Sequence, residues 1–576
     1  MSFQVSPGVE TREIDLTNVI PAVSVSTGAI AGAFNWGPVE QIVTVNSEKT
    51  LVDRFSTPDS RTAKYFMPAA QFLRYSNTLR VVRAEQAGML NAVPADPADP
   101  LSGNPILVKN LEDFETKLFG AGQEFIAKFP GELGNSIGVI LFSSVEAFNE
   151  FEDDFGYKDQ FDFPPSTTEF ADSKGVSSDE LHVLVIDVDG RITGNAGAVL
   201  EVFQGLSQAF DAKKSDGTTN YYKTVINTSS RYVWAGSNPI NLPNAGERTD
   251  SNNLVVESDS VSFETDSEAN VFFLGAGSNG TAEEPTLGEL VQAYDLFEDG
   301  ETVDVSFIIG VDAGEDDAAL AEELIAIAEQ RRDAVAFVSP SITRTANNPN
   351  AEQNVLTFAS GIQSSSYAVI DSGALYVYDK YNDVFRWVVA AGDVAGLCAN
   401  TDAVSDPWFS PAGFNRGQLR GVTRLAFNPT KTQRDDLYKA RVNPIVSFPG
   451  EGTVLFGDKT ALARPSAFDR INVRRLFIVL QKAISVAARA QLFELNDEFT
   501  RAQFRSLVEP FLRDVQGRRG ITDFKLVCDE TNNTAEVIDS NRFIADIYIK
   551  PSRSINFITL NFVAVRTGVE FSEITG

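Results

Sequence analysis

The sequence predicts a mixed α/β fold with about three to five domains, and three observations support this prediction. The chain has 576 residues, of which 43% are hydrophobic and 42 are Phe, so it can bury several cores. Residues 303–338 follow a strand–helix–strand pattern. Four prolines within 91–105 indicate a connection between domains.

The N-terminal part begins with an extended arm and continues as α/β structure. Residues 1–20 are predicted to be extended, because Ser6-Pro7-Gly8 favours a turn and no helical period follows it. Beyond the arm, the apolar pattern predicts three strands and one helix, near 29–34, 41–45, 79–83 and 63–75 respectively.

A second domain is predicted from about residue 106 to residue 335. It contains a strand at 181–187, and Asp189-Gly190 favours a hairpin turn after it. The crossover at 303–338 has strands at both ends and a helix between them, whose apolar residues recur at helical spacing: Leu320, Leu324, Ile327 and Ala328. Two strands joined by a helix imply a piece of parallel sheet.

The C-terminal third contains two amphipathic helices. The first follows Phe468, with Val473, Phe477, Leu480, Ile484 and Ala487 on one face. The second has the clearest period in the chain, is interrupted by Pro510, where we expect a kink, and ends at Gly517 and Gly520. Its apolar residues are Phe504, Leu507, Val508, Phe511, Leu512 and Val515.

The C-terminal end looks like an unpaired piece of sheet. The run from Phe543 to Val565 is dense in β-branched and aromatic residues, which predicts two strands with a break near Pro551. Strands at a chain end leave backbone N–H and C=O groups open, and these can pair with another chain.

The charge is large and unevenly distributed. The formal net charge of −31 disfavours nucleic acid and anionic membrane surfaces as partners. Residues 251–330 contain 20 Asp and Glu and no Lys or Arg, whereas 458–525 contain 13 basic and 8 acidic residues. We predict a basic patch in the second segment that contacts an acidic partner; solvated helix faces with internal salt bridges are the alternative. The patch comprises Arg470, Arg474, Arg475, Arg501, Arg505 and Arg513.

Two glycine-rich stretches resemble nucleotide-binding loops, but the residues around them do not fit a nucleotide-binding site. Gly275–Gly280 fits G-x-G-x-x-G, yet two carboxylates and Pro285 follow where a helix should begin, which favours a glycine turn. Gly452–Thr460 nearly matches a Walker A loop, but Asp458 places negative charge where the phosphate should bind, and the residues between the glycines are strand-like.

The titratable residues also give no positive support for catalysis. Asp187 and Asp189 could face one cation, but the following glycine favours a hairpin. His182 is the only histidine, which excludes a His-based triad or His-pair metal site within one chain. We therefore predict no catalytic residue, no cofactor and no metal; a carboxylate-dependent enzyme with an acidic cleft is an alternative.

The cysteines and the apolar runs indicate the compartment in which the protein is found and whether it enters a membrane. Cys398 and Cys528 do not suggest a disulfide framework, which indicates a reducing compartment. The N-terminus has no basic-then-apolar signal, and no uncharged apolar run reaches the ~18 residues that span a bilayer. We expect no membrane insertion.

Several blocks together resemble the contractile tail sheath proteins of long-tailed bacteriophages. The resemblance covers the first 80-odd residues and nearly everything after about residue 285. The blocks are Ser6-Pro-Gly-Val-Glu10, Phe34-Asn-Trp-Gly-Pro38, Leu79-Arg-Val-Val-Arg83, Phe129-Pro-Gly-Glu-Leu-Gly134, Tyr378-Asp-Lys-Tyr-Asn-Asp-Val384, Trp408-Phe-Ser-Pro-Ala-Gly-Phe-Asn-Arg-Gly417, Ile471-Asn-Val-Arg-Arg-Leu-Phe477, Cys528-Asp-Glu-Thr-Asn-Asn-Thr534 and the C-terminal run.

The resemblance implies a structural subunit of a contractile sheath rather than an enzyme. Such subunits form hexameric rings, stacked as a helical polymer around the tail tube, and contraction drives the tube through the host envelope. The implied partners are further copies of the chain, the tail tube protein, and the baseplate and tail terminator proteins. The implied location is the virion tail, assembled in the host cytoplasm. The sheath of a bacterial contractile injection system is the alternative.

The resemblance also implies a discontinuous core domain, built from N- and C-terminal segments, with protruding domains inserted. We expect a middle domain at 21–90 plus 340–375, a protruding domain at 106–339 and a C-terminal core domain at 376–554. The Pro-rich linker 91–105 replaces an outer domain of larger relatives. Arms at 1–20 and 555–576 would add strands to neighbours through Val5, Val9, Ile14, Ile555, Phe557, Ile558, Leu560 and Phe562.

Overall fold

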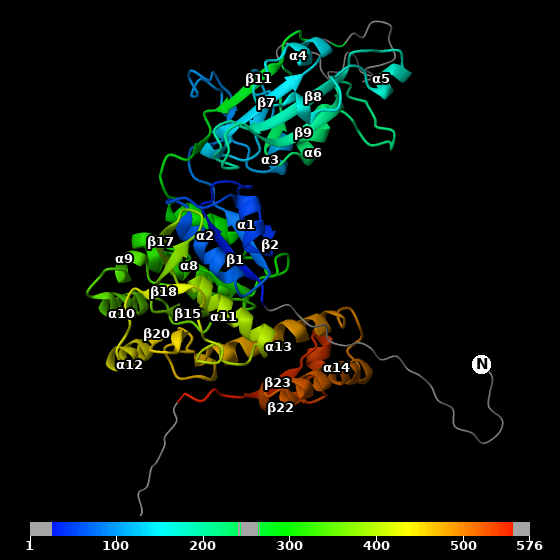
Figure 1. The fold of residues 1–576 in the computed structure, drawn as a ribbon. Coiled ribbons are helices and arrows are strands. Elements are labelled where there is room, and N and C mark those ends of the chain that lie inside the picture. Colours follow the sequence, from blue (N-terminus) through cyan, green and yellow to red (C-terminus); the bar gives the residue numbers. More distant parts are fainter. Residues whose placement is uncertain (1–25, 240–241, 243–262, 264, 557–576) are drawn as a thin grey trace, which may run out of the picture. The chain divides into compact units, whose positions relative to one another are not determined.

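The computed structural model describes residues 26–239, 242, 263 and 265–556, and these divide into two compact units. The larger, called the central unit here, lies within Ser24–Val404 and Pro411–Pro465. The smaller, called the C-terminal unit, combines Ser405–Ser410 with residues from Ser466 onward. Both contain helices and strands (Figure 1), so the predicted mixed α/β, multidomain fold is confirmed.

The central unit is organised by a seven-stranded sheet. Neighbouring strands pair in parallel, except β2 and β3, which are antiparallel. Most of these strands are buried, because the helices between them pack over the sheet. The strand order is β19 (Val442–Asn443), β15 (Ala368–Asp371), β14 (Val335–Val338), β13 (Phe307–Ile309), β1 (Gly28–Gly32), β3 (Leu79–Arg83) and β2 (Val43–Val45).

The helices of the central unit pack in pairs. α2 (Ala63–Leu73) packs against α11 (Ala391–Val404), and α7 (Leu287–Asp295) packs against α8 (Asp317–Arg331). The first pair approaches closely, because a Cβ at Gly392 of α11 would collide with the Pro68 backbone of α2. Outside residues 89–279, the other described α-helices of the central unit are α1 (Glu48–Phe55), α9 (Ile342–Thr345), α10 (Ala351–Gly361) and α12 (Lys431–Lys439).

The predicted crossover is confirmed. β13, α8 and β14 follow one another, and the two strands pair in parallel with Phe307 opposite Val335. The strands predicted near 29–34, 41–45 and 79–83 and the helix near 63–75 also form, as β1, β2, β3 and α2.

The predicted domain boundary at residue 339 is wrong. β13 pairs with β1 and β14 pairs with β13, so both strands lie in the sheet that the N-terminal segment begins. The sequence shows that 303–338 is a crossover, but a crossover pattern does not state which sheet it joins. That pairing is made across almost 280 residues.

An antiparallel sheet forms a peripheral β domain, defined here as residues 89–279. Its strand order is β5 (Val93–Pro94), β11 (Asn270–Gly275), β7 (Ile137–Phe142), β8 (Glu180–Asp187) and β9 (Ala198–Ser207). Two smaller pairs are β6 (Phe125–Ala127) with β10 (Val233–Ala235) and β4 (Met89–Leu90) with β12 (Ser278–Asn279). Its helices are α3 (Leu111–Thr116), α4 (Val145–Glu150), α5 (Glu169–Ser173) and α6 (Tyr222–Ser229).

The Pro-rich stretch 91–105 is more than a linker. Val93 and Pro94 pair with β11, and the backbone of Asn91 bonds to that of Ile106, so the stretch contributes to the peripheral β domain. Pro94 can occupy this position because β5 is an edge strand.

The C-terminal unit consists of two long helices and a β-hairpin. α13 (Ile471–Arg489) and α14 (Glu498–Gly517) are followed by β22 (Ile521–Val527), α15 (Ala535–Asp539) and β23 (Asp546–Pro551). α14 contains Pro510 without a break in the helix, and it ends at Gly517, where the sequence predicts its end. The predicted start of the C-terminal domain at 376 is wrong, because 411–465 and the residues up to 404 belong to the central unit.

The motifs that resembled binding loops have structural explanations. Cβ atoms at Gly275 and Gly277 would collide with the carbonyl oxygens of Pro100 and Gly131, so these glycines allow backbone segments to approach. The Asp187 carboxylate accepts the backbone N–H groups of Ile192 and Thr193, which closes the β8–β9 loop. No helix in the described part of the chain is long and apolar enough to cross a bilayer.

Two carboxyl groups are buried inside the central unit. Burial raises the pKa of Asp371, at the end of β15, to about 7, although the Ser339 hydroxyl and the Gly373 N–H partly offset this. Burial also raises the pKa of Asp393 in α11 to about 7, partly offset by the charge of Arg74 and the Tyr75 hydroxyl. Below about pH 7, both groups are therefore mainly protonated in the folded chain.

These two groups should make the central unit more stable at pH 6 than at pH 8, an effect that is partly offset by Lys128, because burial lowers the pKa of this lysine to about 7. In the unfolded chain a carboxyl titrates near 4, so the stability from the raised pKa is lost as pH rises through about 7, by about 1 kcal/mol per group over this range. Asp371→Asn should remove one share of this dependence, measured by thermal unfolding at both pH values. Asp435→Asn, at an exposed site in α12, is the matched control; equal pH dependence in both variants would contradict the assignment.

Candidate functional site: the assembly surfaces

The peripheral β domain is joined to the seven-stranded sheet by an aromatic anchor. Trp36 follows β1 in the chain, yet its side chain is buried in the core of the peripheral β domain. Its ring contacts the ring of Phe129 edge-on, with centroids 5.3 Å apart, and lies 6.4 Å from that of Tyr232. Trp36, from the chain segment that forms the seven-stranded sheet, thus belongs to the core of the peripheral β domain.

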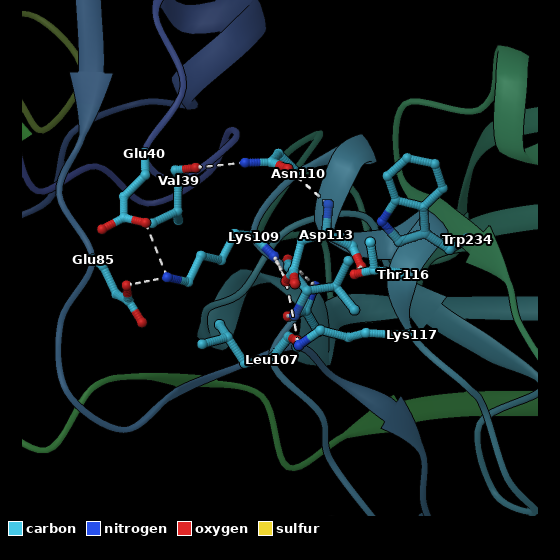
Figure 2. Close-up of polar contacts among 12 residues, drawn as sticks. Val39, Glu40, Glu85, Leu107, Lys109, Asn110, Asp113, Thr116, Lys117 and Trp234 are labelled. Carbon is cyan, nitrogen blue, oxygen red and sulfur yellow. Dashed lines mark hydrogen bonds and ion pairs between the residues drawn. The ribbon is translucent and has the colours of Figure 1, made fainter. Parts of the chain in front are cut away.

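A lysine reinforces the same junction. Figure 2 shows Lys109, just before α3, reaching between Glu40 and Glu85, which flank the sheet strands. Its Nζ lies 2.9 Å from Glu40 Oε2 and 2.5 Å from Glu85 Oε2. Burial opposes the lysine charge, but hydrogen bonds and the charges of both carboxylates outweigh it, so the pKa of Lys109 is raised.

Backbone groups complete this contact. The Val39 N–H donates to the carbonyl oxygen of Lys109 at 3.0 Å, and Asn110 Nδ2 donates to the carbonyl oxygen of Val39 at 3.3 Å. Asn110 also caps α3, because its Oδ1 accepts the Asp113 N–H. The anchor, the ion pairs and these bonds hold the sheet segment and the peripheral β domain together.

The hairpin of the C-terminal unit is a sheet of only two strands in the described residues. β22 and β23 pair from Ile521 opposite Pro551 to Val527 opposite Asp546, so each strand has one edge without a neighbouring strand there. The predicted strand before Pro551 is therefore paired within its own chain. Its outer edge still presents backbone donors and acceptors.

One face of this hairpin is apolar and incompletely covered. Phe524 lies opposite Ile549 and Leu526 opposite Ile547, and all four pack against the core formed by α13 and α14. They are nevertheless only partly buried. A further strand beside the hairpin would extend this layer and cover more of the same apolar surface.

The residues of the predicted basic patch lie in different environments. Arg474, Arg475 and Arg501 are buried, and Arg501 Nη1 donates to the Asn496 side chain at 2.9 Å. Helical spacing predicts which residues share a face but not what packs over it, so these three do not form an exposed surface in one chain. Arg513 is 71% exposed, whereas Arg505 and Arg470 are half-buried.

Most of the predicted arm residues lie outside the described residues: Val5, Val9, Ile14, Phe557, Ile558, Leu560 and Phe562. Ile555 is described and 82% exposed. In the described ranges no group of three or more His, Cys, Asp or Glu side chains could hold a metal ion.

Comparison with known proteins decides the family. A central domain of phage tail sheath proteins matches residues 289–461, a tail sheath C-terminal domain matches 463–564, and the domain III N-terminal region of the tail sheath protein Gp18 matches 26–84. The tail sheath protein of Vibrio phage KVP40 is 35% identical, with 99% of each chain covered. The chain belongs to the phage tail sheath family.

Other relatives agree. The tail sheath proteins of Enterobacteria phage T4 and Salmonella phage ViI are 34% and 32% identical and cover 99% and 100% of this chain, and 99% and 98% of their own. The alignment with the KVP40 protein spans 680 positions, more than the 576 residues of this chain, so that relative has residues without a counterpart here.

Solved structures share the fold at low sequence identity. A sheath tail protein of Listeria innocua has a TM-score of 0.52 at 12% identity, over 92% of this chain and 96% of its own. The contracted helical sheath of the anti-feeding prophage has a TM-score of 0.51 at 12% identity, over 98% and 99%. Family membership identifies a structural component of a contractile phage tail, not an enzyme.

Sequence reasoning missed Trp36 and Lys109 as functional residues. Trp36 was part of a family-like block, but only the structure shows its ring inside another domain. Lys109 stands in no recognisable motif, and its two partners are 69 and 24 residues away in sequence.

Replacing Lys109 by Met should loosen the junction. Two carboxylates would then face each other without a cation, and we expect a loss of about 1 kcal/mol locally, because the groups are partly exposed. Hydrogen exchange of residues 36–40 and 107–111 should quicken about fivefold, measured by mass spectrometry. Lys158→Met is the control, because Lys158 donates to the carbonyl oxygens of Asn149 and Phe151, outside both monitored segments; equal effects of both variants would contradict a junction role.

Proposed function

We propose that this chain polymerises as stacked six-membered rings around a tail tube and that contraction of the polymer drives the tube through the host envelope. Family membership supports the sheath role. The observation that carries the assembly proposal is the β22–β23 hairpin, whose outer edges have no neighbouring strand among the described residues and whose apolar face is only partly covered.

Strand addition by the terminal arms would link the subunits. The chain beyond Asn556 continues as Phe-Ile-Thr-Leu-Asn-Phe-Val, a strand-like sequence that a neighbour's hairpin could accept. Main-chain hydrogen bonds tolerate rotation of the bodies that they connect better than a packed interface does. The arms at 1–20 and 555–576 would therefore keep subunits joined while the sheath contracts.

The junction suggests which parts move together. Trp36 and Lys109 couple the peripheral β domain to the seven-stranded sheet, so these two parts would move as one body. The parts of the chain that change conformation during contraction would then be the arms that connect the subunits.

The basic residues of α14 are our candidates for contact with the tube. Arg505 and Arg513 lie on the side of α14 that is not fully buried. The buried Arg501 would support the start of the helix, through Asn496, rather than touch a partner.

The other partners and the location follow from the same role. Baseplate and tail terminator proteins would bind the two ends of the polymer, and assembly would take place in the host cytoplasm. All three curated relatives come from phages, which favours a virion over a bacterial injection device. Neighbouring capsid and terminase genes would indicate a phage, whereas a gene for a recycling ATPase would indicate an injection device.

Electron microscopy of the purified protein tests the proposal. The full chain should form long striated cylinders, whereas a chain lacking residues 1–18 should remain a folded monomer, because it lacks one linking arm. Cylinders of normal length from the truncated chain would contradict the role of the arm. Small globular oligomers of the full chain with a bound ligand would contradict the sheath proposal.

Arg505→Glu with Arg513→Glu should weaken assembly on the tube without unfolding the C-terminal unit. Reversing two charges on α14 should reduce the fraction of sheathed tubes about tenfold if both face an acidic surface. The measurement counts sheathed tubes after mixing with tube protein. Lys439→Glu, at a position that is 77% exposed in α12, is the control; normal sheathing by the double variant would contradict tube contact.

A further inference from the structure

A second, smaller sheet of the central unit carries an exposed aromatic face. β16 (Ala374–Asp379) lies between β17 (Val384–Val389) and β18 (Val422–Leu425), and both pairings are antiparallel. Alternate residues point inward and are buried, among them Leu375, Val377 and Val388. The outward positions carry Tyr376, Tyr378, Phe385, Trp387 and Arg424, which we call the aromatic platform.

The rings of the aromatic platform form a continuous layer. Tyr376 stacks on Phe385 with centroids 5.5 Å apart and contacts Trp387 at 4.7 Å, and Tyr378 contacts Phe385 at 5.2 Å. Cross-strand aromatic pairs of this kind are rigid. Tyr378 and Phe385 remain 45% and 48% exposed, so the layer is open to a partner.

Arg424 is held over these rings. Its guanidinium carbon lies 4.6 Å from the centroid of Tyr376 and 4.9 Å from that of Trp387. Within the described residues its guanidinium makes no hydrogen bond and no ion pair, although the side chain is exposed. A planar cation fixed in this way has its N–H groups available for a carboxylate, which they can bind in a bidentate manner.

The composition of this surface is that of a protein–protein contact. Trp, Tyr and Arg are the residues that most often dominate binding energy at such contacts. The chain segment that contains Arg424 is basic: residues 411–441 contain seven Lys and Arg and two Asp. The complementary partner is therefore an acidic protein surface.

The same chain supplies such a surface elsewhere. The end of α7, the loop after it and the exposed side of α8 carry Asp295, Glu298, Asp299, Glu301, Glu322 and Glu323, all exposed; we call this set the acidic patch. It lies inside the 80-residue stretch 251–330, which has no Lys or Arg. No hydrogen bond or ion pair joins the acidic patch to the aromatic platform within the described part of one chain.

We propose that the aromatic platform of one copy docks on the acidic patch of a second copy, with Arg424 bound to carboxylates of that copy. This inference rests on the proposed function, because it assigns a contact between subunits of the polymer. Two different surfaces meet, so the contact is heterologous. Repetition of a heterologous contact produces rings or helices rather than closed pairs.

Chemical cross-linking tests the contact directly. In the Arg424→Lys variant, a carbodiimide can join the lysine amine to a carboxylate in an ion pair, whereas the wild-type arginine does not react. Polymers are formed from equal parts of isotope-labelled and unlabelled Arg424→Lys chains, and the cross-linked peptides are identified by mass spectrometry. We expect mixed-label peptides that join residue 424 to carboxylates within 295–323; assembled polymers that give only same-chain links, or links to other segments, would overturn the proposal.

Charge reversal supplies an independent measurement. Arg424→Glu should raise the concentration needed for polymerisation about tenfold, and so should Glu298→Arg combined with Glu323→Arg. The triple variant should recover part of the loss. Lys174→Glu, at an exposed site at the end of α5, is the control, with thermal unfolding as a check on folding.

The results of these experiments distinguish a failure of the proposed contact from a failure of the proposed sheath function. If the wild-type chain polymerises and Arg424→Glu polymerises equally well, the proposed contact is wrong and the sheath role stands. If the wild-type chain forms no polymer with or without tube protein, the sheath role itself fails.

Discussion

The parallel pairing of β1 with β13 is the constraint on which the central unit depends. Gly28 lies opposite Phe307 and Ala29 opposite Ile308, while β3 pairs along the other side of β1. The chain therefore leaves the sheet after β3 and must return beside the same strand at β13. The peripheral β domain is inserted along this path, and its two ends lie together because β4 pairs with β12, Leu90 opposite Ser278. That is why the peripheral β domain is attached through one small region, which Trp36 and Lys109 reinforce.

Local features of this architecture could be predicted from the sequence, because their determinants are close together in the chain. The crossover at 303–338 and the helices α13 and α14 follow from apolar spacing alone. Sheet membership could not be predicted in this way, because the partner of β13 is some 280 residues distant. Family resemblance supplied the general architecture but not the boundaries, and two of those that we predicted, at 339 and 376, were wrong.

For the candidate surfaces, too, the sequence predicted local features but not the contacts between residues that are distant in the chain. An amphipathic period assigned Arg501 to a polar face of its helix, yet the preceding loop covers it and Asn496 accepts its hydrogen bond. The aromatic platform was not recognised as a surface, although the block from Tyr378 to Val384 was noted for its resemblance. Only the pairing of β16 with β17 and β18 brings Trp387 and Arg424 onto one face.

The segment Ser405–Ser410 gives the C-terminal unit an unusual covalent connection. Trp408 belongs to the core of that unit, where its Nε1 donates to the carbonyl oxygen of Arg518 and its own carbonyl oxygen accepts from Asn472 Nδ2. The chain therefore enters the C-terminal unit, leaves it and enters again, at residues 405, 411 and 466. Within the described residues, three separate stretches of backbone therefore join the two units. A single proteolytic cut in any one of these stretches would leave the two units covalently connected through the other two.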